Sequence, residues 1–384
     1  MLNEPSILAS GQAAPPTQEA SGTSVKDPVH EQLEVAVSSV MDIQQVEYNP
    51  APPISARFTG RLLIDSEAAY EHVDELFAPL DYHVLLTTND EGQQVIMALK
   101  GRVNPRPRPR WPNAVLLILT LLSLLFAGAA HEAGMRDQTE LVLWRGWPYA
   151  LGMILILGTH ELGHYFAARY HRVSVTLPYF IPAPIGFGTL GAFIQLREPM
   201  RNRKILFDVG VAGPLAGLVV ALPILIIGLA TSDIKPLPVE DYVLEGDSIL
   251  YAIAKLAIFG KWLPNGQEDV FINQLAKAGW TGLFITGLNL IPLGQLDGGH
   301  VAFTLLGKQA YRFYFPILGV FLLLSLFNSA WILWTLLLMF LGRSYAVPLD
   351  TITQLGPRRR WLGYAAMIVF VLVFVPNPLQ LVRP

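Results

Sequence analysis

The sequence of 384 residues contains no cysteine and unusually few charged residues. Without cysteine the chain has no disulfide, no thiolate metal ligand and no cysteine nucleophile, so any bound metal requires His, Asp or Glu. Only 15% of the residues are charged and 52% are hydrophobic, whereas soluble domains usually carry about 25% charged residues. This composition predicts a polytopic membrane protein.

The charges are unevenly distributed along the chain. Residues 1–100 hold 15 acidic and 4 basic residues, and residues 101–384 hold 15 acidic and 23 basic residues. We therefore expect an acidic soluble part followed by membrane spans with cationic flanks. The basic residues lie at the ends of apolar runs and form no continuous patch, so no nucleic-acid partner is expected.

The soluble part divides into a tail, a small domain and a linker. Residues 1–28 lack apolar periodicity and a signal-peptide core, which predicts a disordered tail. Residues 29–100 predict a small α+β domain that faces the cytoplasm. Residues 101–112, rich in Arg and Pro, predict a stiff linker. The expected helices of the domain are 31–41 and Glu67–Phe77, and its expected strands are Arg57–Ile64, Tyr82–Thr88 and Gln94–Leu99.

Apolar runs occupy most of residues 113–375 and predict six or seven transmembrane helices, followed by a tail at 376–384. One run, 313–341, is interrupted at Asn328-Ser329, so it is either two short crossings or one tilted helix. Cationic residues at the run ends place those ends inside the cell. The runs are 113–130, 147–168, 206–230, 276–292, 313–341 and 361–375. The predicted class is an all-α polytopic membrane protein with a short re-entrant β segment and an N-terminal α+β domain.

The second apolar run contains His160-Glu161-Leu-Gly-His164. Residues four apart lie on one helix face, so both imidazoles can bind the same metal ion. Glu161 is adjacent and can act as general base toward a metal-bound water. No other side chain between Trp147 and Ala168 is charged near neutral pH. Each charge inside a membrane helix costs about 2.5–3.5 kcal/mol, and a metal ion compensates this cost.

Two imidazoles leave such a metal short of one protein ligand. Asp297 follows a distant apolar run and precedes two glycines, in a segment that Pro292 breaks. Broken backbone at membrane depth is tolerated where it lines a cavity or is buried in protein. Without cysteine the third ligand is a carboxylate or another histidine, so His300 competes with Asp297 for this role.

These two motifs together resemble the site-2 protease family of intramembrane zinc metalloproteases. The matching patterns are H-E-L-G-H at 160–164 and N-x-x-P-x-x-x-L-D-G-G at 289–299. The resemblance covers roughly residues 110–375 and implies that zinc is bound by His160, His164 and Asp297. It further implies that Glu161 activates the water and that Asn289 contacts substrate or the developing oxyanion.

The resemblance is to one branch of that family. The membrane part contains no PDZ-like insertion and no CBS pair, and the acidic domain and Gly191–Arg203 resemble a bacterial and plastid-type branch. That branch includes the plant proteins of ethylene-dependent gravitropism. Because the first residues are unlike a transit peptide, we expect the bacterial version in the cell membrane. The cluster Gly210/Gly213-Pro214/Gly217 also occurs in such proteases and lets helices approach closely.

The segment Val173–Leu196 is too rich in Pro and Gly for a helix and too apolar for a solvated loop. It predicts either a strand or hairpin beside the active site, whose edge pairs with an extended substrate, or a packed re-entrant connector.

We therefore predict a zinc endopeptidase that cleaves membrane proteins within or near their transmembrane segments, in contact with the lipid bilayer. The alternatives are a metal transporter, in which the polar residues form a transit site, and a non-catalytic zinc-binding scaffold. The acidic domain either docks over the cytoplasmic entrance and gates substrate or is tethered independently.

Overall fold

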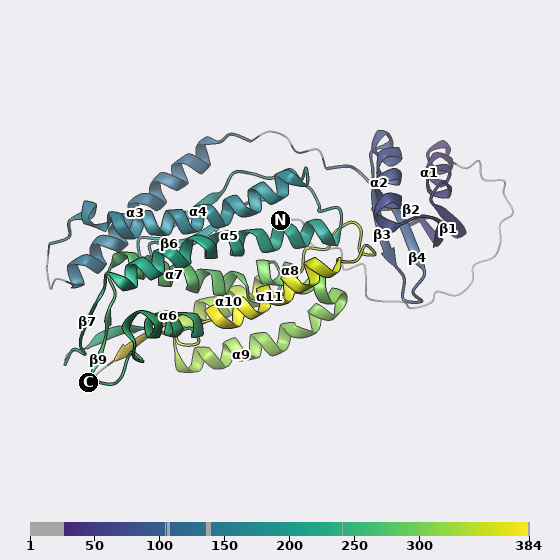
Figure 1. Ribbon diagram of the computed structural model, residues 1–384. Coiled ribbons are helices and arrows are strands. Elements are labelled where there is room, and N and C mark those ends of the chain that lie inside the picture. The colour runs from purple at the N-terminus through teal and green to yellow at the C-terminus, as the bar shows by residue number, and fades with distance from the viewer. Residues whose placement is uncertain (1–26, 104, 106–107, 136–139, 240, 383–384) are drawn as a thin grey trace.

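The computed structural model describes residues 27–382, apart from 104, 106–107, 136–139 and 240. Figure 1 shows a long helical body with a small unit of helices and sheet at one end. Of the predicted disordered tail, residues 1–26 lie outside the described residues.

The N-terminal unit is an antiparallel four-stranded sheet with strand order β1-β2-β4-β3 and two helices. Strands β2 to β4 and helix α2 lie within three residues of their predicted positions. The elements are α1 (Pro28–Ser38), β1 (Met41–Ala51), β2 (Ile54–Leu62), α2 (Ser66–Phe77), η1 (Ala78–Leu80), β3 (Tyr82–Thr88) and β4 (Gln94–Lys100).

The prediction missed one strand at the start of this unit. Helix α1 is present, three residues nearer the N-terminus than the predicted 31–41, but β1 was not predicted. Strand β1 is an edge strand whose side chains are largely exposed, so its sequence lacks a clear apolar alternation.

One core holds the unit together. Helices α1 and α2 contact each other and pack against the sheet. Asp27 and Asp65 cap them, each accepting a hydrogen bond of 3.1 Å from a first-turn N–H. The buried core includes Leu33, Val37, Phe58, Val73, Phe77 and Val84.

The helical body contains helices that follow the predicted apolar runs. Among the residues that the structure describes, three stretches are long and apolar enough to cross a membrane: Trp111–Met135, Arg203–Ala230 and Asp297–Phe327. The break at Asn328-Ser329 separates two helices of 14 and 12 residues, so this run is not one continuous helix. The helices are α3 (Trp111–Met135), η2 (Leu143–Gly146), α4 (Trp147–Tyr170), α5 (Arg203–Ala230), α7 (Gln274–Asn289), α8 (Asp297–Leu306), η3 (Gly307–Phe313), α9 (Tyr314–Phe327), α10 (Ala330–Leu341) and α11 (Pro357–Val373).

The prediction of an otherwise all-α body was incomplete. At the end opposite the N-terminal unit lie a short helix and two small antiparallel sheets (Figure 1). Four-residue strands are too short to produce a recognisable alternation in the sequence. These elements are β7 (Asp233–Pro236) with β9 (Glu268–Phe271), β8 (Tyr242–Glu245) with β10 (Leu379–Val382), and α6 (Ile249–Phe259).

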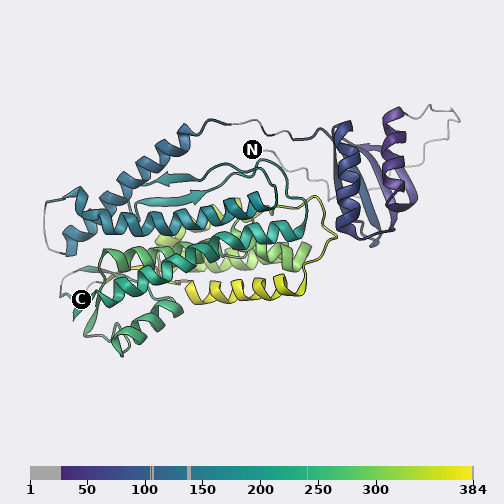
Figure 2. The ribbon, with the colours of Figure 1, turned by 45° about the horizontal axis from the view of Figure 1, so that its top comes forward.

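Helices α4, α5 and α7 contact one another in the body (Figure 2). Small residues allow the close approach of α4 to its neighbours. A Cβ atom on Gly163 would lie 2.6 Å from the carbonyl oxygen of Ala212 on α5, and one on Gly152 would lie 2.7 Å from the Ala278 side chain on α7. The position of α4 is therefore fixed by backbone packing.

The predicted hairpin in Val173–Leu196 is present. Strands β5 (Tyr179–Pro182) and β6 (Thr189–Phe193) pair antiparallel, and Gly186 and Gly188 in the turn have positive φ angles of 61° and 81°. Glycine adopts these angles without steric cost. Strand β5 contacts α3 and β6 contacts α4, so β6 lies on the side of the motif helix.

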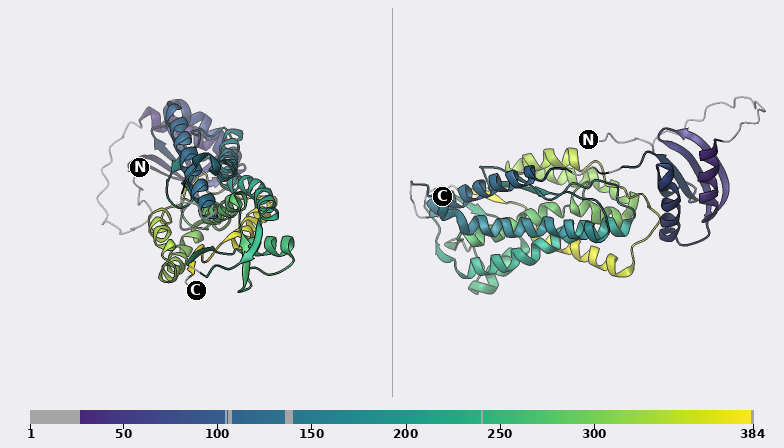
Figure 3. Two further views of the ribbon diagram at one scale, coloured as in Figure 1. Left: turned by 90° about the vertical axis from the view of Figure 1, so that its left-hand side faces the viewer. Right: turned by 90° about the horizontal axis from the view of Figure 1, so that it is seen from above.

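The segment at residues 349–351 joins the N-terminal sheet to the helical body. Figure 3 shows how these two parts of the chain are placed relative to each other. Leu86 of β3 donates its N–H to the carbonyl of Leu349 (2.8 Å) and accepts from the N–H of Thr351 (2.9 Å). The N–H of Leu349 in turn donates to the carbonyl of Met200 (2.9 Å). Hydrogen bonding thus continues from the edge of the N-terminal sheet to the segment that precedes α5.

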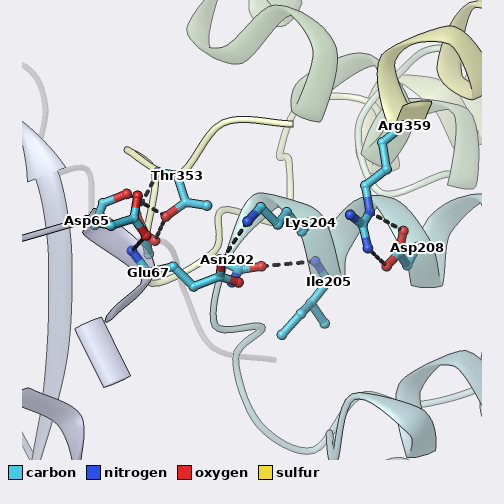
Figure 4. A network of polar contacts seen from close by, with 10 residues as sticks. Asp65, Glu67, Asn202, Lys204, Ile205, Asp208, Thr353 and Arg359 are labelled. Atoms are coloured by element: carbon cyan, nitrogen blue, oxygen red, sulfur yellow. Dashed lines mark hydrogen bonds and ion pairs between the residues drawn. The ribbon is translucent and has the colours of Figure 1, made fainter. Parts of the chain in front are cut away.

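Polar side chains reinforce this junction (Figure 4). Glu67 of α2 accepts hydrogen bonds from Asn202 (3.0 Å) and Lys204 (2.5 Å), while Asn202 also caps α5 through the N–H of Ile205 (3.0 Å). Asp350 is fully buried here; burial raises the pKa of its carboxyl, and hydrogen bonds from Thr353 oppose that rise.

Candidate metal centre

Helix α4 presents the motif residues to the interior of the body. His160, Glu161 and His164 are 3%, 4% and 6% exposed. The two imidazoles are one helical turn apart, and their Nε2 atoms are 3.2 Å from each other. The four-residue spacing thus brings both rings to one point, as the sequence predicts.

Asp297 completes the group. It is the first residue of α8, which follows α7 after a short loop and continues along α5 in the same direction as α7. Its Oδ2 atom is 3.2 Å from Nε2 of His160 and 3.3 Å from Nε2 of His164. The ligand atoms of the three residues lie within 4.8 Å of one another, as a shared metal ion requires.

Two further predicted residues lie at the same place. Nδ2 of Asn289, at the end of α7, is 3.3 Å from Nε2 of His160. His300 lines the same cavity, but among the described residues the only group that could hold a metal is His160, His164 and Asp297. The geometry therefore favours Asp297 over His300 as the third ligand.

The orientation of His164 suits a metal ligand. Its Nδ1 atom lies 2.7 Å from the carbonyl oxygen of Val209 on α5. Because a carbonyl oxygen only accepts, Nδ1 carries the proton and Nε2 presents its lone pair to the group. A hydrogen bond of this kind to the other ring nitrogen is the usual support of a metal-bound histidine.

The glycines of α5 make room for the two rings. A Cβ atom on Gly213 would overlap the His164 ring, and one on Gly217 would lie 3.1 Å from Cβ of His160. From the sequence alone, these glycines indicate close helix contact in general. Their specific role is to leave space for the two imidazoles. This role depends on how α4 packs against α5, which the sequence pattern does not predict.

A cavity of about 230 Å³ opens at the three ligands. Its wall includes Ala192, Phe193 and Ile194 from the end of β6, and the backbone amide of Ile194 interacts with the Glu161 carboxylate. Leu196 and Met200 also line the cavity, and sequence reasoning missed both because apolar side chains in a connector carry no motif.

This donor set fits zinc. Two imidazole nitrogens and one carboxylate oxygen are a known ligand set of catalytic zinc, which keeps its fourth position open for water or substrate. The cavity beside the ligands supplies space for that position, and Glu161 supplies a carboxylate next to it.

Comparison with known proteins identifies one family. Residues 148–326 match the model of peptidase family M50. The "Probable zinc metalloprotease EGY2, chloroplastic" of Arabidopsis thaliana is 33% identical over 310 residues, which cover 77% of this chain and 55% of that protein. The EGY2 protein of Oryza sativa subsp. indica is 31% identical over 77% of the chain and 56% of its own length.

The similarity extends to a second group of plant relatives. The "Probable zinc metalloprotease EGY1, chloroplastic" of Arabidopsis thaliana is 30% identical over 71% of this chain and 54% of its own length. The chain thus spans about half the length of the curated relatives it matches. No solved structure matches.

Proposed function

Because this chain belongs to peptidase family M50, we propose that it is a zinc endopeptidase that cleaves membrane proteins within or near their transmembrane segments. The observation that carries the proposal is the meeting of His160, His164 and Asp297 at a buried cavity, with Glu161 beside it. Two of these residues lie on α4 and the third begins α8, so the folded chain assembles the group.

The residues take distinct roles in this proposal. When bound by His160, His164 and Asp297, zinc supplies Lewis acidity and lowers the pKa of a coordinated water to about 7. The carboxylate of Glu161 accepts a proton from the attacking water and then donates it to the leaving amine nitrogen. The side-chain amide of Asn289, directed at the same point, hydrogen-bonds the substrate near the scissile bond.

The membrane arrangement is also a proposal. We propose six or seven spans within residues 113–375, a separate α+β domain at 29–100 joined by the linker at 101–112, and a tail at 376–384. The cationic helix ends near the N-terminal unit support a cytoplasmic position for that unit in the cell membrane. Docking through Leu86 and Glu67 favours a fixed domain beside the cytoplasmic entrance over an independently tethered one.

Substrate binding is proposed at β6. Its residues Ala192 and Phe193 pair with β5 and also line the metal cavity, so β6 lies between its partner strand and the metal ligands. A substrate that unwinds beside this strand can form backbone hydrogen bonds to it. Such pairing would expose the scissile peptide bond, which a transmembrane helix otherwise holds in its own hydrogen bonds.

A single cysteine tests this placement, because the chain has none of its own. With Phe193→Cys in a Glu161→Gln background, we expect disulfide crosslinking to a substrate cysteine next to the scissile bond. Ile185→Cys at the hairpin turn, 79% exposed, is the matched control and should crosslink at most one tenth as much. Equal crosslinking at both positions would contradict the proposal that substrate pairs with β6.

Metal analysis tests the proposed function itself. The purified chain should contain one zinc per molecule, and a chelator should abolish cleavage of a transmembrane model substrate, with recovery on zinc addition. A transporter would instead move metal across vesicles without proteolysis. A scaffold would bind zinc and cleave nothing, so the two rival functions give separate results.

A further inference from the structure

A second cavity lies at the junction of the N-terminal unit and the helical body. Its volume is about 270 Å³. One wall comes from α2, and the others come from the end of α4, the start of α5 and the start of α11. Four cationic side chains and two acidic ones line it: Arg172, Arg201, Lys204 and Arg359, with Glu67 and Glu71.

Two of the four cations are already paired. Lys204 lies 2.5 Å from Glu67, and Arg359 makes two hydrogen bonds of 2.7 Å to Asp208 (Figure 4). In contrast, the guanidinium groups of Arg172 and Arg201 form no hydrogen bond or ion pair with another described residue.

The backbone at Arg172 adds a second observation. Its φ angle is +58°, a left-handed conformation that costs a residue with a Cβ atom and favours glycine or asparagine. This conformation ends α4 in the usual left-handed cap, with the N–H of Val173 donating to the carbonyl of Ala168 (2.9 Å), and the Arg172 side chain lines the cavity that also contains Arg201. Only one acidic group of the lining, Glu71, has no cationic partner among the described residues.

Exposed aromatic residues indicate the depth of the cavity relative to the bilayer. Tyr170, which lines it, is 83% exposed, and Trp361 on α11 is 74% exposed. Tyrosine and tryptophan concentrate at membrane interfaces, where their rings lie at headgroup level. The cavity therefore lies where lipid phosphates occur, and basic pockets between membrane helices on the cytoplasmic side bind anionic headgroups.

We propose that this cavity binds the phosphate group of an anionic phospholipid, with Arg172 and Arg201 as its ligands. Guanidinium groups recognise phosphate through paired hydrogen bonds. Because α2 forms one wall, a bound headgroup strengthens the contact between the N-terminal unit and the membrane helices. The proposal depends on the position of these helix ends at the membrane surface and not on the proteolytic activity.

Thermal unfolding of the full chain in neutral detergent tests the site. Added phosphatidylglycerol should raise the wild-type unfolding temperature, and phosphatidylcholine at the same concentration should not. For the double variant Arg172→Gln/Arg201→Gln, the lipid concentration that gives half of the shift should rise at least tenfold. Glu71→Gln, which removes the unpaired carboxylate, should lower that concentration.

Control variants separate a site from general charge attraction. Arg312→Gln/Arg343→Gln removes the same charge from outside the cavity and should leave the lipid response unchanged. An equal loss in this control would overturn the proposal. Arg172→Lys/Arg201→Lys keeps the charge without the paired hydrogen bonds, so its half-maximal lipid concentration should lie between those of the wild type and the Gln variant. This Lys variant also tests the site if the Gln variant folds poorly. If inorganic phosphate alone reproduces the full shift, the ligand is a soluble phosphate and not a lipid.

Discussion

The Glu161→Gln variant should fold and bind zinc as the wild type does but cleave a transmembrane substrate about 10² to 10⁴ times more slowly. Glutamine keeps the size of the side chain and its contact with the Ile194 amide, so the structural change is small. It removes the carboxylate that takes up the proton, and general acid–base groups contribute about 10² to 10⁴ in rate. Among the described residues that line the cavity, the other carboxylate is Asp297, which faces both imidazoles.

Single-turnover cleavage in detergent, together with zinc content and helical signal, checks this expectation. Glu161→Asp retains the carboxylate at a shorter reach and should recover part of the rate. Full turnover by Glu161→Gln with normal zinc content would show that another group transfers the proton. Loss of zinc in that variant would instead assign Glu161 a structural role in the metal group.

The sequence predicts those parts of the site that depend on residues close together in the chain. His160, Glu161 and His164 lie within one helical turn, so the spacing alone places both imidazoles on one face. From the residues alone, Asp297 also fits a turn, because Asp before glycine is common in turns. Its position at the start of α8, beside both imidazoles, results from the packing of α8 along α5.

The features that the sequence does not predict depend on contacts between distant segments. Leu86 pairs with Leu349, and Glu67 pairs with Asn202 and Lys204. Neither contact has a local pattern, since an exposed strand edge can accept any extended segment. The docking of the N-terminal unit and the second cavity therefore become visible only in the folded chain.

The close packing of α4 against α5 leads to a second large expected effect. Gly213→Ala should lower zinc affinity about 10- to 100-fold, the range seen when support of a metal ligand is lost. The added Cβ would overlap the His164 ring. Helix α5 also packs closely against α7, where a Cβ atom on Gly279 would lie 2.5 Å from Cα of Leu225, so its backbone has little room to move away from α4. The ring must therefore turn away from Val209 and from the other two ligands.

Gly158→Ala is the matched control for this change. Gly158 lies on α4, two residues before His160, and a Cβ atom there would meet nothing within 4 Å. Alanine favours a helix over glycine by about 1 kcal/mol, so this variant should keep its zinc and unfold at the same or a higher temperature. Zinc content after dialysis against a graded chelator series compares the two variants. Equal retention by both would mean that His164 does not lie against Gly213 in the metal-bound protein, and the assignment of α5 as the wall that orients the ligands would be wrong.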